Sequence, residues 1–457
     1  MKRSALAALA SAVRGSVVAP WDDHYDAARR VWNGTIDKKP ALLVNCLGTG
    51  DVVESLQFAR AHDLGVSVRS AGHHVAGSAV LEDGLVIDLS QMRAVEVEGS
   101  NGRVRVEGGA QIADVDRVTQ QHGLAVPLGV VSETGVAGLT LAGGYGHLRR
   151  KHGLSCDNVL AVDLVTAEGR ELHVSAEHEP ELFWGLRGGG WDLGVVVGFE
   201  YQAHPVGPEV YLMFVTYPLA EGRQVLMALN EFMADAPREA SVLAACMTLP
   251  ENEEYPEELH GQPVVGVLCP YAGDPKQGES VLAPLRALGT VLIDLSGVVQ
   301  WTEAQQFFDA DYPRGGRYHW KSAHLSGLGD DAVDVLLDMT SRRPSTAATL
   351  DIWFNGGAIS DVPATATPIS TRAFPVMIGI EANWTDPAAD RVNREWSQEV
   401  AAALKPHSAG GAYLNFDDLT DPDAARVAHG KNYDRLVAVQ RSFDPHNVFR
   451  SRRGATG

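Results

Sequence analysis

The sequence predicts an α+β protein of two domains. The first about 70 residues alternate strand-like and helix-like runs, which is typical of an α/β unit. Residues 209–407 instead carry β-like runs interspersed with amphipathic helices, as in an antiparallel sheet covered by helices. The composition shifts between these regions at His204-Pro205-Val206-Gly207-Pro208, and we place a domain boundary there.

Composition excludes several classes of function. The 457 residues are 45% hydrophobic and 21% charged, which is ordinary for a globular protein. A net charge of −20 argues against a nucleic-acid partner. No apolar run approaches the roughly 20 residues needed to span a bilayer, so we expect no membrane span. The four cysteines are far apart without metal-ligand spacing, and we expect reduced thiols, no metal and a cytoplasmic protein.

The N-terminus has two interpretations. Met1 to Val13 has a basic start, a short apolar stretch and Ala-Ser-Ala, as in a signal peptide. The apolar stretch is mostly alanine, and Arg14-Gly15 would end a helix there. We therefore favour a first amphipathic helix, followed by a strand-like Ser16-Val17-Val18.

The remaining elements follow from periodicity and turn residues. In the first domain we expect helices at 22–33, 51–62 and 112–122, and strands at 41–46, 66–69, 84–89, 95–97, 104–106, 159–166, 171–175 and 195–197. Residues 182–190 end in a third glycine cluster, which runs into the last of these strands. In the second domain we expect strands at 211–217, 263–268, 349–354 and 376–382, and helices at 223–233, 280–288, 331–339 and 389–404. After Gly410-Gly411 we expect a short strand, 412–416, and a helix, 432–442.

A loop rich in small residues follows the strand at 66–69. It reads Arg69, Ser70, Ala71, Gly72, His73, His74, with Gly77 just beyond. Small residues allow close approach of a ligand to the backbone, consecutive free N–H groups form an anion nest, and Arg69 could add a positive charge suited to phosphate. The alternative is an ordinary strand-to-turn junction with solvated histidines.

A second glycine-rich stretch covers residues 129–146, with six glycines in eighteen residues. It matches neither the Walker pattern nor the Rossmann dinucleotide fingerprint. Either it is a loose surface loop, or its backbone packs flat against a planar group. The interleaved Val130, Val131, Val136, Leu139 and Leu141 favour the second interpretation, because they indicate burial.

Taken in order, these features resemble a known family. The Arg/His loop, the glycine-rich stretch, Arg187-Gly-Gly-Gly before a strand, Tyr413-x-Asn415 and Asp444-Pro-x-Asn447-x-Phe449 resemble the FAD-linked oxidases of the vanillyl-alcohol oxidase superfamily. Within it, the chain is similar to the berberine-bridge-enzyme-like group, from about Trp32 to Phe449, and especially to bacterial members that include polyketide-tailoring enzymes. The resemblance implies a PCMH-type FAD-binding domain formed by residues 1–206 and 408–457, with a substrate domain of residues 207–407.

The resemblance also implies roles for individual residues. The 69–74 loop would hold the FAD pyrophosphate, and His73 would bond the flavin 8α carbon. Val131 stands where bicovalent relatives have a cysteine, so we expect no second bond. Thr134 occupies the position that controls oxygen access; its volume, close to that of valine, favours access, whereas its hydroxyl could hold water. Further cofactor contacts are expected from Gly77, Gly135, Gly138, Leu139, Gly143, Gly144, Tyr145, Val195, Asn415 and Asn447.

The expected chemistry is oxidation of a small molecule. A substrate alcohol, amine or activated C–H would give a hydride to covalent FAD while Tyr413 takes a proton, and O2 would become H2O2. A flavin dehydrogenase, an oxygenating flavoenzyme and a non-catalytic flavin-binding protein remain as alternatives. Asp351, Trp353, His319 and Lys321 lie on segments that could face a substrate, but structural roles are favoured for each. We expect a monomer or homodimer.

Overall fold

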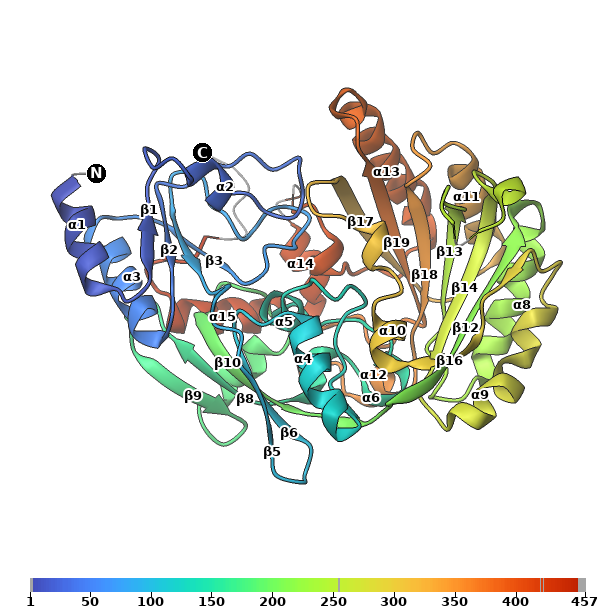
Figure 1. Ribbon diagram of the computed structural model, residues 1–457, viewed down its shortest axis with the longest axis horizontal. Coiled ribbons are helices and arrows are strands. Elements are labelled where there is room, and N and C mark those ends of the chain that lie inside the picture. Colours follow the sequence, from blue (N-terminus) through green and yellow to red (C-terminus); the bar gives the residue numbers. More distant parts are fainter. Residues whose placement is uncertain (1–2, 254, 420, 422, 451–457) are drawn as a thin grey trace.

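The structure is a computed structural model that describes residues 3–253, 255–419, 421 and 423–450. Figure 1 shows two lobes: one holds the small sheets formed by the N-terminal residues, and the other holds one large sheet with helices on its outer side. The chain passes once from the first lobe to the second and comes back at its end.

Two small sheets form the first lobe. One has the order β1-β2-β4-β3, with the last three strands parallel: β1 (Ser16–Val18), β2 (Leu42–Asn45), β4 (Leu85–Asp88) and β3 (Val66–Arg69). The other is antiparallel: β5 (Val95–Glu98), β6 (Arg103–Glu107), β10 (Val195–Gln202), β8 (Val159–Val165) and β9 (Glu171–Ser175). A short pair, β7 (Leu124–Ala125) and β11 (His204–Pro205), lies near the junction of the lobes.

Apolar helix faces cover these sheets. Helices α1 (Arg3–Ala12) and α3 (Thr49–Ala61) pack on the first sheet through leucine and valine side chains. The second sheet shares a core with four helices: α4 (Ile112–Thr119), α5 (Val136–Leu141), α7 (Pro180–Leu186) and α15 (Tyr433–Phe443). The glycine-rich stretch thus contains a short buried helix, α5.

One large sheet forms the second lobe. Its strands run in the order β15 (Ile293–Asp294), β12 (Glu209–Pro218), β14 (Pro263–Tyr271), β13 (Leu243–Thr248), β18 (Thr349–Phe354), β19 (Val376–Trp384) and β17 (Arg317–Leu325), with β16 (Gly297–Gln300) on β12. Alternate side chains of these strands point to opposite faces. Leu350, Ile352, Ile378 and Ile380 join the core under the outer helices, whereas Asp351, Trp353 and Glu381 face the first lobe.

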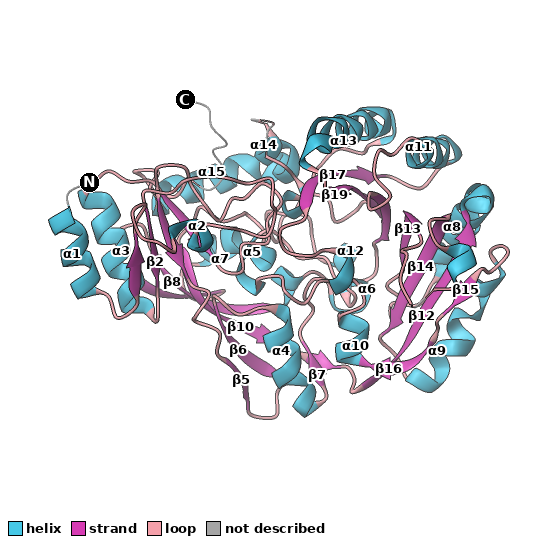
Figure 2. Ribbon diagram, turned by 45° about the horizontal axis from the view of Figure 1, so that its top comes forward, coloured by secondary structure: helices cyan, strands magenta, loops and turns pink. Residues whose placement is uncertain are grey.

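The outer helices are visible along one side of the large sheet in Figure 2. They are α8 (Gly222–Asp235), α9 (Pro275–Leu282), α11 (Asp330–Ser341) and α13 (Asp390–Leu404). The shorter helices are α2 (Tyr25–Ala28), α6 (Arg149–His152), α10 (Trp301–Gln305), α12 (Ala358–Asp361) and α14 (Ala424–His429). These helices cover one face of the sheet, and the opposite face lies toward the first lobe.

The end of the chain is fastened back to the first lobe. The amide of Val66 donates to the Val448 carbonyl, and the amide of Arg450 donates to the Val66 carbonyl. Asp444 accepts hydrogen bonds from the amides of Val448 and Phe449 and so holds the turn that brings these residues beside β3.

Three predicted elements differ from the structure. The helix expected at 280–288 overlaps only the end of α9 and continues as a 3-10 helix over Ala283–Ala287. The helix expected at 22–33 is only α2, because the Trp32 amide donates to Gly72 and the Asn33 side chain donates to the Val75 and Tyr318 carbonyls. The strand expected at 412–416 is a 3-10 turn over Leu414–Phe416. Gly410 and Gly411, at φ 87° and 85°, turn the chain before it, and the Phe416 amide closes on the Tyr413 carbonyl.

Candidate active site

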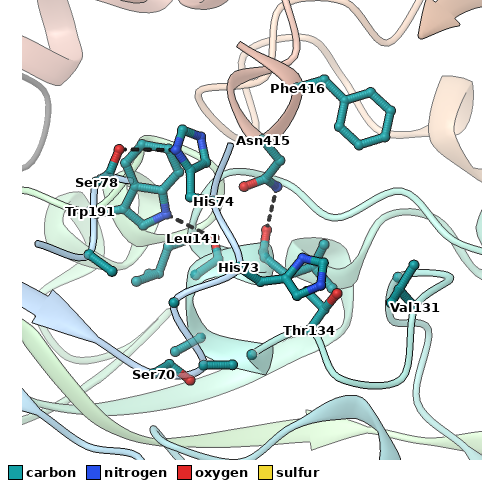
Figure 3. A pocket seen from close by; sticks show the side chains of 18 of the residues that line it. Ser70, His73, His74, Ser78, Val131, Thr134, Leu141, Trp191, Asn415 and Phe416 are labelled. Carbon is teal, nitrogen blue, oxygen red and sulfur yellow. Dashed lines mark hydrogen bonds between the residues drawn. The ribbon is translucent and has the colours of Figure 1, made fainter. Parts of the chain in front are cut away.

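A deep cavity separates the loops of the first lobe from the inner face of the large sheet. It encloses about 1380 Å³ of empty space including its open mouth. Both glycine-containing loops, the Tyr413 segment and strands β18 and β19 contribute to its wall. The predicted site residues that line it are Ser70, Ala71, Gly72, His73, His74, Val131, Thr134, Gly135, Gly138, Leu139, Tyr145, Tyr413 and Asn415. Figure 3 shows several of these side chains around the cavity.

The loop after β3 presents unused donors to the cavity. Within the described residues, the backbone N–H groups of Ala71, Gly72 and His73 donate no hydrogen bond, and the buried Ser70 Oγ has no partner. Gly72 has φ 71°, a conformation that favours glycine. Consecutive free N–H groups beside a cavity form a nest for an anion such as a phosphate.

His73 is held as a neutral ring with a free nitrogen. It stacks on Trp32 with ring centroids 4.2 Å apart, and Trp32 stacks in turn on Tyr318. Its buried Nε2 has no hydrogen-bond partner among the described residues. Burial, with a smaller effect of the Arg314 charge, lowers the pKa of His73 to about 3. His73 lines the cavity, and a neutral imidazole has one ring nitrogen whose lone pair can act as a nucleophile.

His74 joins this loop to the Tyr413 segment. The Ala76 amide donates to its Nδ1, so Nε2 carries the proton and donates to the Leu414 carbonyl at 2.9 Å. Burial is the main cause that lowers the pKa of His74 to about 4, which keeps this tautomer neutral. The side chain therefore fixes the position of residue 414, between Tyr413 and Asn415.

The glycine-rich stretch forms the facing wall. Figure 3 shows Val131 and Thr134 in the same cavity as His73. Gly135 lies against the first loop so closely that a Cβ there would be 2.5 Å from Ser70 Oγ. Asp309 of the second lobe accepts hydrogen bonds from the Ser132 amide and hydroxyl and so anchors the stretch.

Tyr413 has an unusual hydrogen-bond environment. Its hydroxyl oxygen accepts from the Tyr145 amide at 3.1 Å and from Asn415 Nδ2 at 2.9 Å. The second hydrogen of that Asn415 amide goes to the Leu139 carbonyl. Burial raises the pKa of Tyr413, and the two donors oppose this effect because they stabilise a phenolate. These two hydrogen bonds fix the position of the oxygen at the cavity wall.

The second lobe contributes residues to the end of the cavity that is formed by the large sheet. Asp351 and Trp353 line the cavity, as do Leu243, Phe308, Tyr312, Trp320, Glu381 and Phe416. His319 and Lys321 do not: both contact Asp418, at 2.7 Å and 2.9 Å, on the other face of β17. Sequence reasoning missed Glu381, although an acidic residue within the apolar run Val376–Ala382 was a signal available in the sequence.

Six predicted cofactor residues lie outside the cavity lining: Arg69, Gly77, Gly143, Gly144, Val195 and Asn447. Arg69 pairs with Asp88 at 2.5 Å and donates to the Ala28 carbonyl, so its charge is engaged within the protein. Gly144 makes room for Ser155, whose Oγ would lie 2.2 Å from a Cβ. Contacts between these residues and a cofactor stay predictions.

Comparison with known proteins identifies the family. Residues 40–175 match the family model of an FAD binding domain, and residues 412–454 match that described as berberine and berberine like. The (R)-6-hydroxynicotine oxidase of Paenarthrobacter nicotinovorans is 30% identical, with 96% of each chain covered. The chain belongs to the berberine-bridge-enzyme-like family of FAD-linked oxidoreductases.

Three further proteins are similar to this chain over nearly its full length. An FAD-linked oxidoreductase of Dictyostelium discoideum is 28% identical, over 94% of this chain and 92% of its own. The crystal structure of 6-hydroxy-D-nicotine oxidase from Arthrobacter nicotinovorans superposes with a TM-score of 0.84 at 28% identity, covering 96% of this chain and 97% of its own. A BBE-like protein of Physcomitrella patens, 20% identical, has the same fold with a TM-score of 0.88 and covers 97% of both chains.

The chain is therefore an FAD-dependent oxidoreductase, and the cavity residues fit this cofactor. The free N–H groups of residues 71–73 suit the pyrophosphate, and the apolar wall of Val131, Leu139 and Leu141 suits a flat ring system. Within the described part of the chain, no helix is long and apolar enough to cross a membrane. No cluster of three metal-ligating side chains occurs among the described residues.

Proposed function

We propose that this protein is an oxidase of a small molecule, with FAD bonded through His73 alone. The observation that carries the proposal is the position of Tyr413 in the same cavity as His73, with two donors on its hydroxyl oxygen. Bound FAD would supply the electron acceptor, taking two electrons from the substrate and passing them to O2 to give H2O2.

The residues of the chain would act around that acceptor. The free amides of residues 71–73 would hold the pyrophosphate, and His73 would hold the ring system by a bond to its 8α carbon. Val131 offers no thiol, which supports attachment at one point. Thr134, with a side chain the size of valine, would leave room for oxygen.

Tyr413 would accept the substrate proton. As a phenolate, which the Tyr145 amide and the Asn415 side chain stabilise, its oxygen would take the proton of a substrate hydroxyl, amine or activated C–H as electrons depart. Tight packing of Tyr413 between Tyr145 and Phe416 keeps the oxygen in position.

The proposal also covers the localisation and the oligomeric state of the protein. Four buried cysteines, all free among the described residues, support a cytoplasmic enzyme. A monomer or homodimer remains our prediction. A dehydrogenase that uses another acceptor and an oxygenating enzyme are the closest alternatives.

Oxygen consumption tests the proposal. Substrate should bleach the flavin under nitrogen, and admission of air should restore the colour with one H2O2 per substrate oxidised. Slow return of colour in air with rapid return on an artificial acceptor would favour a dehydrogenase. Labelled oxygen in the product would favour an oxygenating enzyme, and an unbleached flavin across a broad panel of alcohols and amines would contradict turnover.

A further inference from the structure

Two carboxyl groups converge at the end of the cavity formed by the large sheet. Asp351 on β18 is paired in register with Gly379 on β19, and Glu381 follows two residues later on the same face. Gly379 leaves space between them: a Cβ there would lie 3.2 Å from Glu381 Oε1 and 3.3 Å from the Cβ of Asp351. Both carboxyls line the cavity.

Neither carboxyl has a cation to balance it. Among the described residues, no lysine, arginine or histidine forms an ion pair with Asp351 or Glu381, which are 4% and 1% exposed. The Tyr312 hydroxyl donates to Glu381 Oε2 at 2.7 Å, but the buried Asp351 Oδ1 has no hydrogen-bond partner in the part of the chain that the structure describes. Lys321, on the adjacent strand, is engaged with Asp418.

An uncompensated buried acid is costly, so the pair holds protons until a cation arrives. Burial raises the pKa of Asp351 to about 7, and burial with the nearby Asp351 charge raises the pKa of Glu381 well above its usual range. Such a site gains most from a ligand that brings a positive charge and hydrogen-bond donors.

The surroundings of the pair are aromatic. Trp320, Trp353 and Phe416 form an edge-to-face cluster, with ring centroids 5.1 Å and 6.0 Å from Phe416. Tyr312 packs on Trp320 with centroids 5.6 Å apart. Aromatic faces attract cations and bury apolar ligand surface. A polyhydroxylated sugar would need several polar partners, whereas the described side chains at this end of the cavity are mostly aromatic.

We infer that the substrate is an amine: its protonated nitrogen binds between Asp351 and Glu381, and its apolar or aromatic body lies against Trp320, Trp353 and Phe416. This rests on the proposed function, since it assigns a substrate class to the same cavity.

Paired probes test the inference in the FAD-loaded protein. Benzylamine, a cation at neutral pH, and benzyl alcohol, its neutral counterpart, are titrated by calorimetry and by the change in flavin absorbance. Benzylamine should bind at least about tenfold more tightly than benzyl alcohol, because only it can form the charge-assisted contacts. Asp351→Asn and Glu381→Gln should each weaken benzylamine by about tenfold or more and leave benzyl alcohol nearly unchanged.

A matched control is Glu399→Gln, which removes an exposed carboxyl of α13 in the same lobe and should change neither affinity. Equal affinity for the two probes, no binding of benzylamine, unchanged binding in both acid variants, or selective binding of cellobiose would overturn the inference. The comparison of benzylamine with benzyl alcohol in the unmodified protein tests the inference even if a variant fails to fold. Absorbance of the same samples reports FAD: protein without FAD contradicts the proposed function, whereas FAD-loaded protein that does not discriminate contradicts only the amine.

Discussion

At the scale of single residues, we expect the Tyr413 hydroxyl to take part in the reaction as the proton acceptor. Its oxygen accepts hydrogen bonds from the Tyr145 amide and from Asn415, and its ring packs on Tyr145 and Phe416. Tyr413→Phe removes one oxygen and no packing surface. We expect flavin reduction by substrate to slow by about 10²- to 10⁴-fold, the usual loss for a missing general base.

Anaerobic stopped-flow absorbance measures that rate. The control is the FAD content of the variant, which should equal that of the unmodified protein because the hydroxyl contributes little to the fold. An unchanged rate of flavin reduction in Tyr413→Phe would remove the residue from the mechanism.

We expect Thr134 to affect a different step, the reoxidation of the flavin by O2. It lines the cavity beside His73, and its amide closes a turn on the Val131 carbonyl at 3.1 Å. Thr134→Leu adds volume at this point and should obstruct O2, whereas Thr134→Val keeps the volume and removes only the hydroxyl. We expect Leu to slow reoxidation of the reduced protein in oxygenated buffer more than it slows flavin reduction, and Val to change neither much. Equal reoxidation in all three proteins would show that volume at residue 134 does not control oxygen.

At the scale of elements, His74 connects the loop after β3 to the turn that carries Tyr413 and Asn415. His74→Gln can keep a donor near the Leu414 carbonyl, whereas His74→Asn is too short to reach it. We expect Asn to slow flavin reduction by about 10- to 100-fold, because a small displacement of Tyr413 misaligns the proton acceptor. Gln should restore most of the rate.

Flavin content, covalent fraction and reduction rate are measured together for the two His74 variants. A purely structural role would lower FAD content in both variants alike. Equal rates in Gln and Asn, with full FAD content, would mean that the bond to Leu414 does not position Tyr413.

The same scale shows what the sequence could predict. Strands β4, β18 and β19 are runs of β-branched and other apolar residues, and each lies at its predicted position. Strand β17 was missed because its sequence, RYHWKSAHL, lacks such a run: His319 and Lys321 are covered by Asp418 from the far end of the chain, and Trp320 faces the cavity. A contact between residues 97 positions apart leaves no local pattern.

The sequence likewise predicted those parts of the candidate site that depend on local patterns, and not those that depend on strand pairing. The small-residue loop with His73 and the Tyr-x-Asn pattern are local, and the structure brings both to one cavity. The proximity of Asp351 and Glu381 depends on the register of two strands, so it could not be predicted without the sheet. The position of Arg69 in the sequence predicted a contact with phosphate. In the structure Arg69 instead forms an ion pair with Asp88 of β4, because β3 and β4 pair in parallel and bring the two residues together.

At the scale of the whole molecule, the cavity exists because two lobes meet. Asp309 and Arg314 of the second lobe hold Ser132 and Glu133 of the first, and Trp32 is stacked between His73 and Tyr318. The Trp32 indole also donates to the Tyr312 carbonyl. These contacts place His73, Tyr413 and the Asp351–Glu381 pair around one space, which is the basis of the central claim that FAD lies there on His73.

Intact-mass measurement of the acid-denatured protein, followed by peptide mapping, tests that claim most directly. The account predicts one FAD per chain that resists acid, on the peptide containing His73, and loss of the covalent flavin in His73→Ala with FAD still able to bind. Flavin released completely by acid, or found on a cysteine peptide, would contradict it.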